Sequence, residues 1–139
     1  MSIENLRVDG FRLQHTMEEM AKIGAIAGGG VQRLSLSRED KEARDLFIHW
    51  LKALDLDITI DEVGNIFGKR LGKNPDLPSV MSGSHLDSQP KGGRFDGTLG
   101  VLGTLEVLRT IVYVIMYMLA GITHAKNKYL KTKLGGNYA

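Results

Sequence analysis

The chain has 139 residues, of which 42% are hydrophobic and 24% are charged, proportions that are ordinary for one modest soluble domain. It contains no cysteine, which excludes disulfides, thiolate zinc sites and cysteine nucleophiles and leaves His, Asp and Glu as metal ligands. The formal net charge of +2 arises near the C-terminus, because four lysines and no acidic residue follow Ile111. The preceding part is slightly acidic, which argues against a nucleic-acid-binding surface there.

The first residues contain no apolar run long enough for a signal peptide, so we expect a cytoplasmic location. The first predicted helix begins near Asp9, which is a suitable N-cap residue. Its apolar face comprises Leu13, Met17, Met20 and Ala21. The helix ends in the stretch IGAIAGGGV, because three consecutive glycines disfavour helical structure.

A stronger helix signal covers about residues 38–53. Ser37 precedes Asp40 at a spacing similar to that of a capping box, and apolar residues then recur at helical intervals. These residues are Ala43, Leu46, Phe47, Trp50, Leu51 and Leu54. The pattern predicts an amphipathic helix that packs against a core.

Residues 56–70, with the sequence LDITIDEVGNIFGKR, predict two strands joined by a tight turn. Gly64 and Asn65 supply the turn, since both residue types tolerate the backbone conformations that short hairpins need. Ile58 and Ile60 alternate with polar residues, which predicts that one face of the first strand is buried.

Residues 79–85, SVMSGSH, predict a short interior strand that ends at His85. A further helix is predicted over residues 97–111, with Leu99, Val101, Leu102, Leu105 and Leu108 packing inward. The order of helices and strands indicates an α/β arrangement of layers. Ligand sites in such sheets lie beyond the carboxyl ends of strands, which is where this interpretation places His85.

The run IVYVIMYMLAGI, residues 111–122, is apolar without interruption. It is shorter than the roughly 20 residues that a membrane-spanning helix needs, and extending it backwards meets Arg109 and Glu106. A buried strand or helix is therefore favoured over a membrane anchor.

The stretch GSHLDSQPKGGRFDG, residues 83–97, carries the strongest chemical signal. His85 and Asp87 are one residue apart, so in an extended segment both side chains point to the same side and the carboxylate can orient the imidazole. Asp96 follows a glycine-rich loop that could fold back to the same pocket. A carboxylate there could bridge two divalent ions, which would polarise a carbonyl and activate a water. From spacing alone, an ordinary surface turn without any function explains the same residues equally simply.

Residues 80–111, VMSGSHLDSQPKGGRFDGTLGVLGTLEVLRTI, resemble the N-terminal catalytic segment of the co-catalytic zinc amidohydrolases. Within that superfamily the segment is most similar to the hydantoinase/carbamoylase group, which includes N-carbamoyl-L-amino-acid hydrolases, β-ureidopropionases and allantoate amidohydrolases. Residues 20–70 resemble the N-terminal region of the same group, so the similarity covers about residues 6–111. The resemblance implies the N-terminal part of a zinc-peptidase-like α/β/α sandwich catalytic domain.

The resemblance also implies a role for each matching residue. His85 corresponds to a zinc ligand, Asp96 to the carboxylate that bridges both metal ions, and Asp87 to the catalytic-site aspartate that orients the histidine. The cofactor implied is a pair of divalent ions, zinc or alternatively manganese or cobalt. The partners implied are a small N-carbamoyl or ureido substrate, such as an N-carbamoyl amino acid or allantoate, and a second subunit of a homodimer. Neither nucleic acid nor a membrane is expected as a partner.

After Ile111 the resemblance ends. The family next requires an acidic pair, two further histidines and a domain that binds substrate and dimerises, but residues 112–139 contain no acidic residue and only one histidine. We therefore expect residues 1–111 to be the N-terminal part of a metal-binding catalytic domain and residues 112–139 to be a divergent tail. A truncated chain of this kind should be inactive alone, and the alternative is a non-catalytic fragment that acts as an association module or has no function.

Three other polar residues have simpler explanations. His15 and His49 lie on the polar sides of the two predicted helices, so we expect both to be exposed to solvent. Arg33 has two equally good interpretations: contact with a substrate carboxylate, or a surface charge that precedes a helix.

Overall fold

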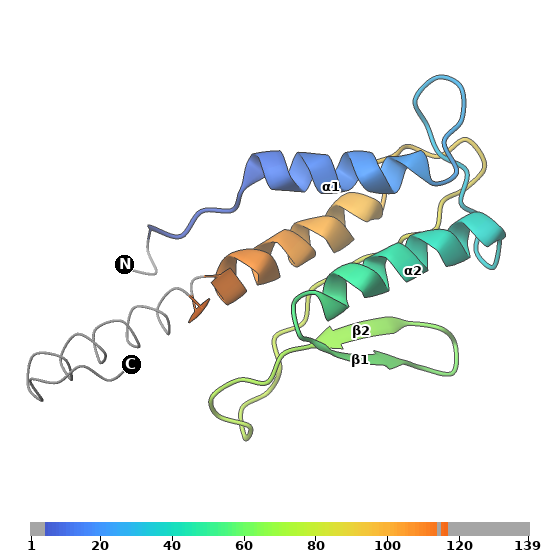
Figure 1. Cartoon of the computed structure of the whole chain (residues 1–139). Coiled ribbons are helices and arrows are strands. Elements are labelled where there is room, and N and C mark those ends of the chain that lie inside the picture. Colours follow the sequence, from blue (N-terminus) through green and yellow to red (C-terminus); the bar gives the residue numbers. More distant parts are fainter. Residues whose placement is uncertain (1–4, 114, 117–139) are drawn as a thin grey trace, which may run out of the picture.

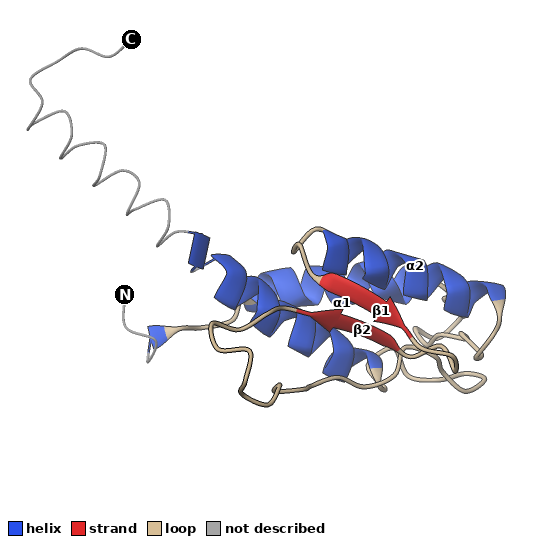
Figure 2. Cartoon of the chain, turned by 90° about the horizontal axis from the view of Figure 1, so that it is seen from below, coloured by secondary structure: helices blue, strands red, loops and turns tan. Residues whose placement is uncertain are grey.

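Three helices and one β-hairpin make up the part of the chain that the computed structural model describes, residues 5–113, 115 and 116 (Figures 1 and 2). Helix α1 spans Gly10–Lys22 and α2 spans Arg38–Lys52, followed by strands β1 (Asp57–Ile60) and β2 (Ile66–Lys69). A third, unlabelled helix covers residues 98–113 and lies between α1 and α2 in Figure 1, so we call it the 98–113 helix. The hairpin lies on the other side of α2, which gives a helical layer with a small sheet beside it.

Both predicted N-terminal helices form where their capping residues placed them. The carboxylate of Asp9 accepts the backbone N–H of Arg12 at 3.0 Å, which satisfies one of the free donors in the first turn of α1. At the start of α2, Ser37 Oγ accepts the backbone N–H of Asp40 at 3.1 Å. The Asp40 carboxylate reaches back to the N–H of Leu36, so the capping interaction runs in both directions.

The hairpin has the predicted antiparallel pairing but a wider turn than predicted. Ile60 pairs with Ile66, which leaves residues 61–65 as the connection. The Asp61 carboxylate closes it by accepting the backbone N–H groups of Val63 and Asn65, at 3.1 and 2.7 Å. Asp61 therefore organises the loop with its side chain, an arrangement typical of aspartate in turns.

The buried face predicted for the first strand is only partly present. Ile58 packs against the core, but Ile60 is 52% exposed. The described sheet has only two strands, and α2 is the element that contacts β1. Alternation of apolar residues shows which face is suited to burial, but a covering layer is needed along the whole strand.

The interior strand predicted over residues 79–85 is wrong for the described structure. No residue of this segment is assigned to a strand, and none of its backbone groups bonds to another described backbone group. Val80 and Met81 are 101% and 78% exposed. A strand exists only through its hydrogen-bonded neighbour, and the described residues offer none beside this segment.

The core is formed where the three helices and the hairpin meet. Its buried apolar members are Met17, Met20, Ala43, Leu51, Leu54, Leu56, Leu86, Val101, Leu102, Leu105 and Val112. The inward packing predicted for the 98–113 helix is confirmed at Val101, Leu102 and Leu105, and Leu108 lies against the same cluster. Leu99 differs, because it is 48% exposed on the side that faces α1 and a neighbouring loop.

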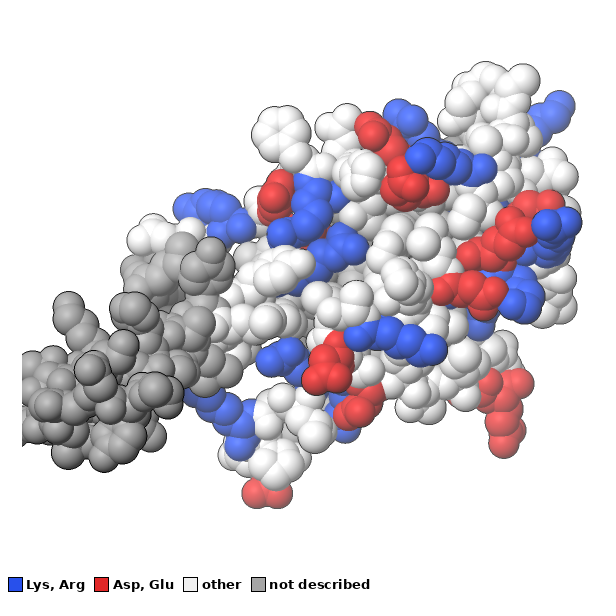
Figure 3. Space-filling model, viewed as in Figure 1, with Lys and Arg blue, Asp and Glu red and all other residues white. Residues whose placement is uncertain are grey.

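Residues 112–139, predicted to be a divergent tail, lie outside the described residues apart from 112, 113, 115 and 116, which are helical. Across the described part of the chain, no helix is both long and apolar enough to cross a membrane. On the face shown in Figure 3, Lys and Arg side chains are interspersed with Asp and Glu. That face therefore carries no broad basic patch of the kind that binds nucleic acid.

Candidate metal-binding half-site

The imidazole of His85 is held by the residue two positions later. His85 Nδ1 lies 3.0 Å from the backbone oxygen of Asp87 and 3.3 Å from its carboxylate Oδ1. Both oxygens are acceptors only, so Nδ1 must carry the proton and donate it. The other ring nitrogen, Nε2, is then unprotonated in the neutral ring and has a lone pair free for a cation.

Asp87 is itself fixed from the other side. Its Oδ2 accepts the Ser35 hydroxyl at 2.6 Å, from the segment that leads into α2. The Asp87 and His85 side chains remain 40% and 51% exposed, so this pair is reachable from solvent. A contact between His85 and Asp87 was predicted from their spacing, and the structure brings the two together, although the backbone oxygen is the nearer acceptor.

Asp96 comes directly before the glycine that contacts the His85 ring. Gly97 has a φ of +64°, and a Cβ atom built on it would lie 2.4 Å from Cε1 of His85. The imidazole therefore rests directly on the backbone of Gly97, one residue after Asp96. The Asp96 residue is exposed, and among described residues nothing donates a hydrogen bond to its carboxylate.

A polar depression of about 180 Å³ opens beside the His85–Asp87 pair. Besides the pair, it is lined by Ser35, Asp40, Arg44, Asn65, Ile66, Ser84 and Leu86. These residues come from α2 and the segment that leads into it, from the hairpin turn and the start of β2, and from the two neighbours of His85 in the chain, and Asp96 is absent from them. Arg44 donates a hydrogen bond to the backbone oxygen of Gly64, which fastens the hairpin turn to α2 at the edge of the depression.

The donor set suits part of a metal site but not a complete one. His85 offers one nitrogen in a fixed tautomer, as a metal-bound histidine requires. Within residues 5–113, 115 and 116, however, no group of three or more His, Asp or Glu side chains is close enough to hold a metal ion. A closed site commonly needs three or four protein ligands, so the described residues supply at most a share of them.

Comparison with known proteins finds similarity over most of the chain. It is 46% identical, over 100 residues, to an N-carbamoyl-L-amino-acid amidohydrolase from Pseudomonas sp., a match covering 72% of this chain and 24% of that protein. It superposes on a crystal structure of a hydantoinase/carbamoylase family amidase from Burkholderia ambifaria with a TM-score of 0.76 and 47% identity, over 78% of this chain and 27% of that one. Over about three quarters of its length, the chain is thus similar to the hydantoinase/carbamoylase family.

Within the family, similarity extends to more distant relatives. A ureidoglycolate hydrolase from Arabidopsis thaliana is 36% identical over 107 residues, which are 77% of this chain and 22% of that protein. The chain thus spans about a quarter of the length of the relatives it matches. These matches confirm the predicted resemblance and the predicted fold class, a partial α/β domain. No protein-family model matches the chain.

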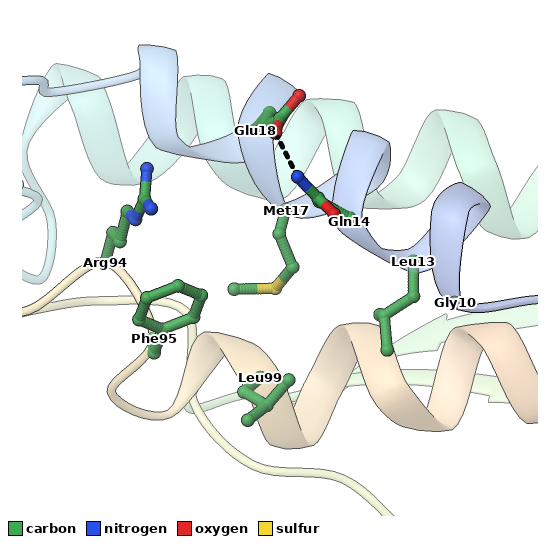
Figure 4. Close-up of a pocket in the computed structure, with 8 residues that line it drawn as sticks. All are labelled: Gly10, Leu13, Gln14, Met17, Glu18, Arg94, Phe95 and Leu99. Atoms are coloured by element: carbon green, nitrogen blue, oxygen red, sulfur yellow. Dashed lines mark hydrogen bonds between the residues drawn. The ribbon is translucent and has the colours of Figure 1, made fainter.

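A second pocket, of about 320 Å³, lies away from the family's motif between α1 and the start of the 98–113 helix (Figure 4). Its walls are mainly apolar, with Leu13, Met17, Phe95 and Leu99 pointing toward the cavity. Its lining includes no histidine, and Glu18 accepts a hydrogen bond from Gln14 at 2.9 Å. This pocket therefore lacks the groups that the hydrolase motif provides.

Arg33 contradicts both interpretations made from the sequence. It is 1% exposed, and its guanidinium bonds inward, to three backbone oxygens and one hydroxyl. Burial lowers the pKa of the guanidinium, while the charges of Asp40 and Asp87 act in the opposite direction. Arg33 thus neither faces solvent nor reaches toward a substrate. His15 and His49 are exposed, as predicted.

Proposed function

We propose that this chain carries part of the active site of a metal-dependent hydrolase of linear amides, acting on N-carbamoyl amino acids or on ureides such as allantoate. In this proposal His85 and Asp96 are metal ligands, and Asp87 orients the imidazole. The relatives support the reaction class, because they include amidohydrolases of N-carbamoyl-L-amino acids and hydrolases of ureidoglycolate.

The observation that carries the proposal is the tautomer of His85. Asp87 accepts the Nδ1–H hydrogen bond, and this leaves the Nε2 lone pair on a half-exposed ring beside a polar depression. A histidine whose only task was packing would need no such orientation. The carboxylate of Asp96, close along the chain to the glycine beneath the ring, is unengaged by described residues and is available to a cation.

The cofactor we propose is a pair of divalent ions, zinc or alternatively manganese or cobalt, with part of their ligands supplied from outside the described residues. Bound divalent ions of this kind polarise a carbonyl oxygen and lower the pKa of a coordinated water. The contribution of this chain would be the His85 imidazole and the Asp87 carboxylate at a solvent-reachable depression, with Asp96 next in the chain to the glycine beneath the ring. We further propose a cytoplasmic location and a homodimeric assembly for the full-length protein.

A chimera tests the function directly. Residues 6–111 replace the matching segment of the Pseudomonas N-carbamoyl-L-amino-acid amidohydrolase, and turnover of an N-carbamoyl amino acid is measured with added zinc or manganese. We expect the chimera to be active and His85→Ala or Asp96→Asn to reduce kcat/KM by more than about a hundredfold. Asp87→Asn should cost about ten- to a hundredfold, the usual effect of losing the partner of a metal-bound histidine.

His49→Ala is the matched control, because His49 is an exposed histidine on α2 and no ligand role is proposed for it. It should leave the activity and metal content of the chimera unchanged. An active chimera that tolerates His85→Ala with full metal content would contradict the proposed site. Equal losses in His49→Ala and His85→Ala would assign the effect to folding instead.

The 139-residue chain alone should show no turnover, even in excess zinc or manganese. The described residues contain no complete ligand group, and residues 112–139 hold no acidic residue that could act as the proton shuttle. The measurement is product formation from N-carbamoyl amino acids by the purified chain. Turnover that disappears in His85→Ala would show that residues 1–139 suffice for catalysis, and would refute this expectation.

A second candidate function, an association module, is favoured by the exposure of Val80 and Met81. Their segment makes no backbone pairing within the described structure, and apolar side chains on such a segment favour pairing with another chain. Size-exclusion chromatography with light scattering tests it. A monomer at all concentrations would count against association, and oligomers dispersed by Val80→Lys would support it.

A further inference from the structure

We propose that Arg33 is a positioning residue that holds the two loops of the half-site, the segment around His85 and the turn that carries Asp96 and Gly97, in register with each other. This inference rests on the proposed function only in treating His85 as a ligand. The register itself is a property of the chain without metal or substrate.

The guanidinium of Arg33 bonds to both loops at once. Its Nε donates to the backbone oxygen of Leu86 at 3.1 Å, one residue after His85. Its Nη2 donates to the hydroxyl of Thr98 at 2.9 Å, one residue after Gly97. The two planar donors are fixed relative to each other, so they fix the distance between the two acceptors.

The bonds from Arg33 to Leu86 and Thr98 form what we call the Arg33 clamp. The remaining contacts of the guanidinium tie this clamp to α1. Nη1 donates to the backbone oxygens of Met20 and Ile23, at 3.2 and 3.1 Å, at the C-terminal end of α1. The free carbonyls at a helix end are natural acceptors for a cation. Arg33 therefore ties the half-site to α1, whose core residues Met17 and Met20 are buried.

The backbone of Arg33 adds a second connection to the same loop. Its N–H donates to Ser88 Oγ at 2.9 Å, and its oxygen accepts the N–H of Ser88 at 2.7 Å. Leu86 and Ser88 are both buried, and they bracket Asp87. The segment 85–88 is thus held through alternate residues while the side chains of His85 and Asp87 point outward to solvent.

The choice of arginine is costly and therefore informative. The guanidinium is buried without a carboxylate within hydrogen-bonding distance, so only neutral acceptors and the more distant charges of Asp40 and Asp87 offset its lost solvation. An apolar residue would fill the space without that cost. Only a rigid, branched donor reaches Leu86, Thr98 and the end of α1 together, whereas lysine has one nitrogen on a flexible stem.

The position and tautomer of the His85 ring therefore depend on the spacing of the two loops that Arg33 joins. The ring lies between Asp87, on one clamped loop, and Gly97, on the other. If the loops separate, the ring loses its support on Gly97 and its Nδ1–H bond to Asp87 is no longer enforced. The proton should then distribute between the two ring nitrogens.

The test measures the ring-nitrogen NMR shifts of His85 in the full 139-residue chain at about pH 8, well above the ordinary pKa of about 6.5 for a free imidazole. His85→Gln assigns the signals. We expect the wild-type chain to show one dominant Nδ1–H tautomer. In Arg33→Lys the two nitrogen shifts should move toward each other, while those of His15 and His49 stay unchanged.

Arg109→Lys is the matched control, because Arg109 is also largely buried and bonds to Thr16 at 2.7 Å, far along the helix from the half-site. It should lower stability but leave the His85 shifts as in the wild type. If Arg33→Lys does not fold, Thr98→Val removes one bond of the clamp at nearly constant shape and should shift His85 in the same direction by less.

Unchanged His85 shifts in folded Arg33→Lys or Thr98→Val would overturn the role of Arg33 and leave the proposed function standing. Equal shifts in Arg109→Lys would overturn it too, because a general loosening would then explain them. An averaged tautomer in the wild-type chain would overturn both proposals.

Discussion

Gly97→Ala should displace the His85 ring and lower the free energy of unfolding by about 2 kcal/mol. Two costs combine, since alanine at a φ of +64° is strained by about 1–2 kcal/mol and its Cβ would overlap the imidazole at 2.4 Å. The ring cannot stay over the glycine, so its hydrogen bond to Asp87 should break. Urea denaturation would measure the stability, and the His85 ring-nitrogen shifts would report the displacement.

Gly93→Ala provides the comparison within the same loop. A Cβ at position 93 would meet no atom within 4 Å, and its backbone does not have a positive φ. This variant should change stability by less than about 0.5 kcal/mol and leave His85 in place. Similar behaviour of the two variants would mean that the close approach of His85 to Gly97 does not exist in solution.

The helices were predictable because local patterns decide them. Asp9 and Ser37 sit at N-caps, and the apolar residues that follow recur at helical intervals, so position and buried face could both be read from neighbouring residues. The contact between His85 and Asp87 belongs to the same class, since two residues of separation suffice to bring them together.

Residues 79–85 show that a local sequence pattern is not sufficient to predict a strand. Its apolar residues and its glycine are compatible with a buried strand, but a strand also needs a hydrogen-bonded neighbour, and no local pattern states whether that neighbour is present. In the described structure it is absent, and Val80 is fully exposed. The prediction was wrong because the neighbouring strand that residues 79–85 would need is set by the assembled sheet and not by local sequence.

The burial of two charged residues, Arg33 and Glu106, was also not predicted from the sequence. Arg33 was expected either to contact a substrate or to lie on the surface, because two of its acceptors, Leu86 and Thr98, lie more than fifty residues away along the chain. Glu106 carried a usable signal, since it falls four residues after Leu102 and thus on the apolar face of its helix. A charge in the middle of such a face indicates a partner, but only the fold reveals that the partner is Arg12.

Glu106→Gln should lower the free energy of unfolding at neutral pH by about 3 kcal/mol. The carboxylate is 1% exposed and accepts Arg12 Nη2 and Nε at 2.6 and 2.9 Å and the backbone N–H of Asp9 at 3.0 Å. Breaking a buried pair leaves the other charge without its counterion, which typically costs about 3–5 kcal/mol. Arg12 is 30% exposed and can regain some solvation, so the lower end of that range applies. Urea denaturation measures the loss.

The pH dependence provides a second, independent check on this pair. Burial raises the pKa of the Glu106 carboxyl, but the bonds from Arg12 and from the N–H of Asp9 outweigh burial and hold it below its ordinary value. Because the folded pKa is the lower one, the stabilisation is complete above the unfolded pKa of about 4.3 and is lost as the pH falls through the folded value. The difference between wild type and Glu106→Gln should therefore shrink in acid.

Glu42→Gln supplies the contrast for the Glu106 result. Glu42 also pairs with an arginine, Arg38 at 2.8 Å, but the two side chains are 47% and 85% exposed, so solvent screens the pair. Its loss should cost less than about 1 kcal/mol. Equal losses in the two variants, or a gap that persists undiminished in acid, would mean that Glu106 does not join α1 to the 98–113 helix as a buried ion pair. A large gap at neutral pH that closes in acid would show that the contact between these helices depends on one ionised carboxylate.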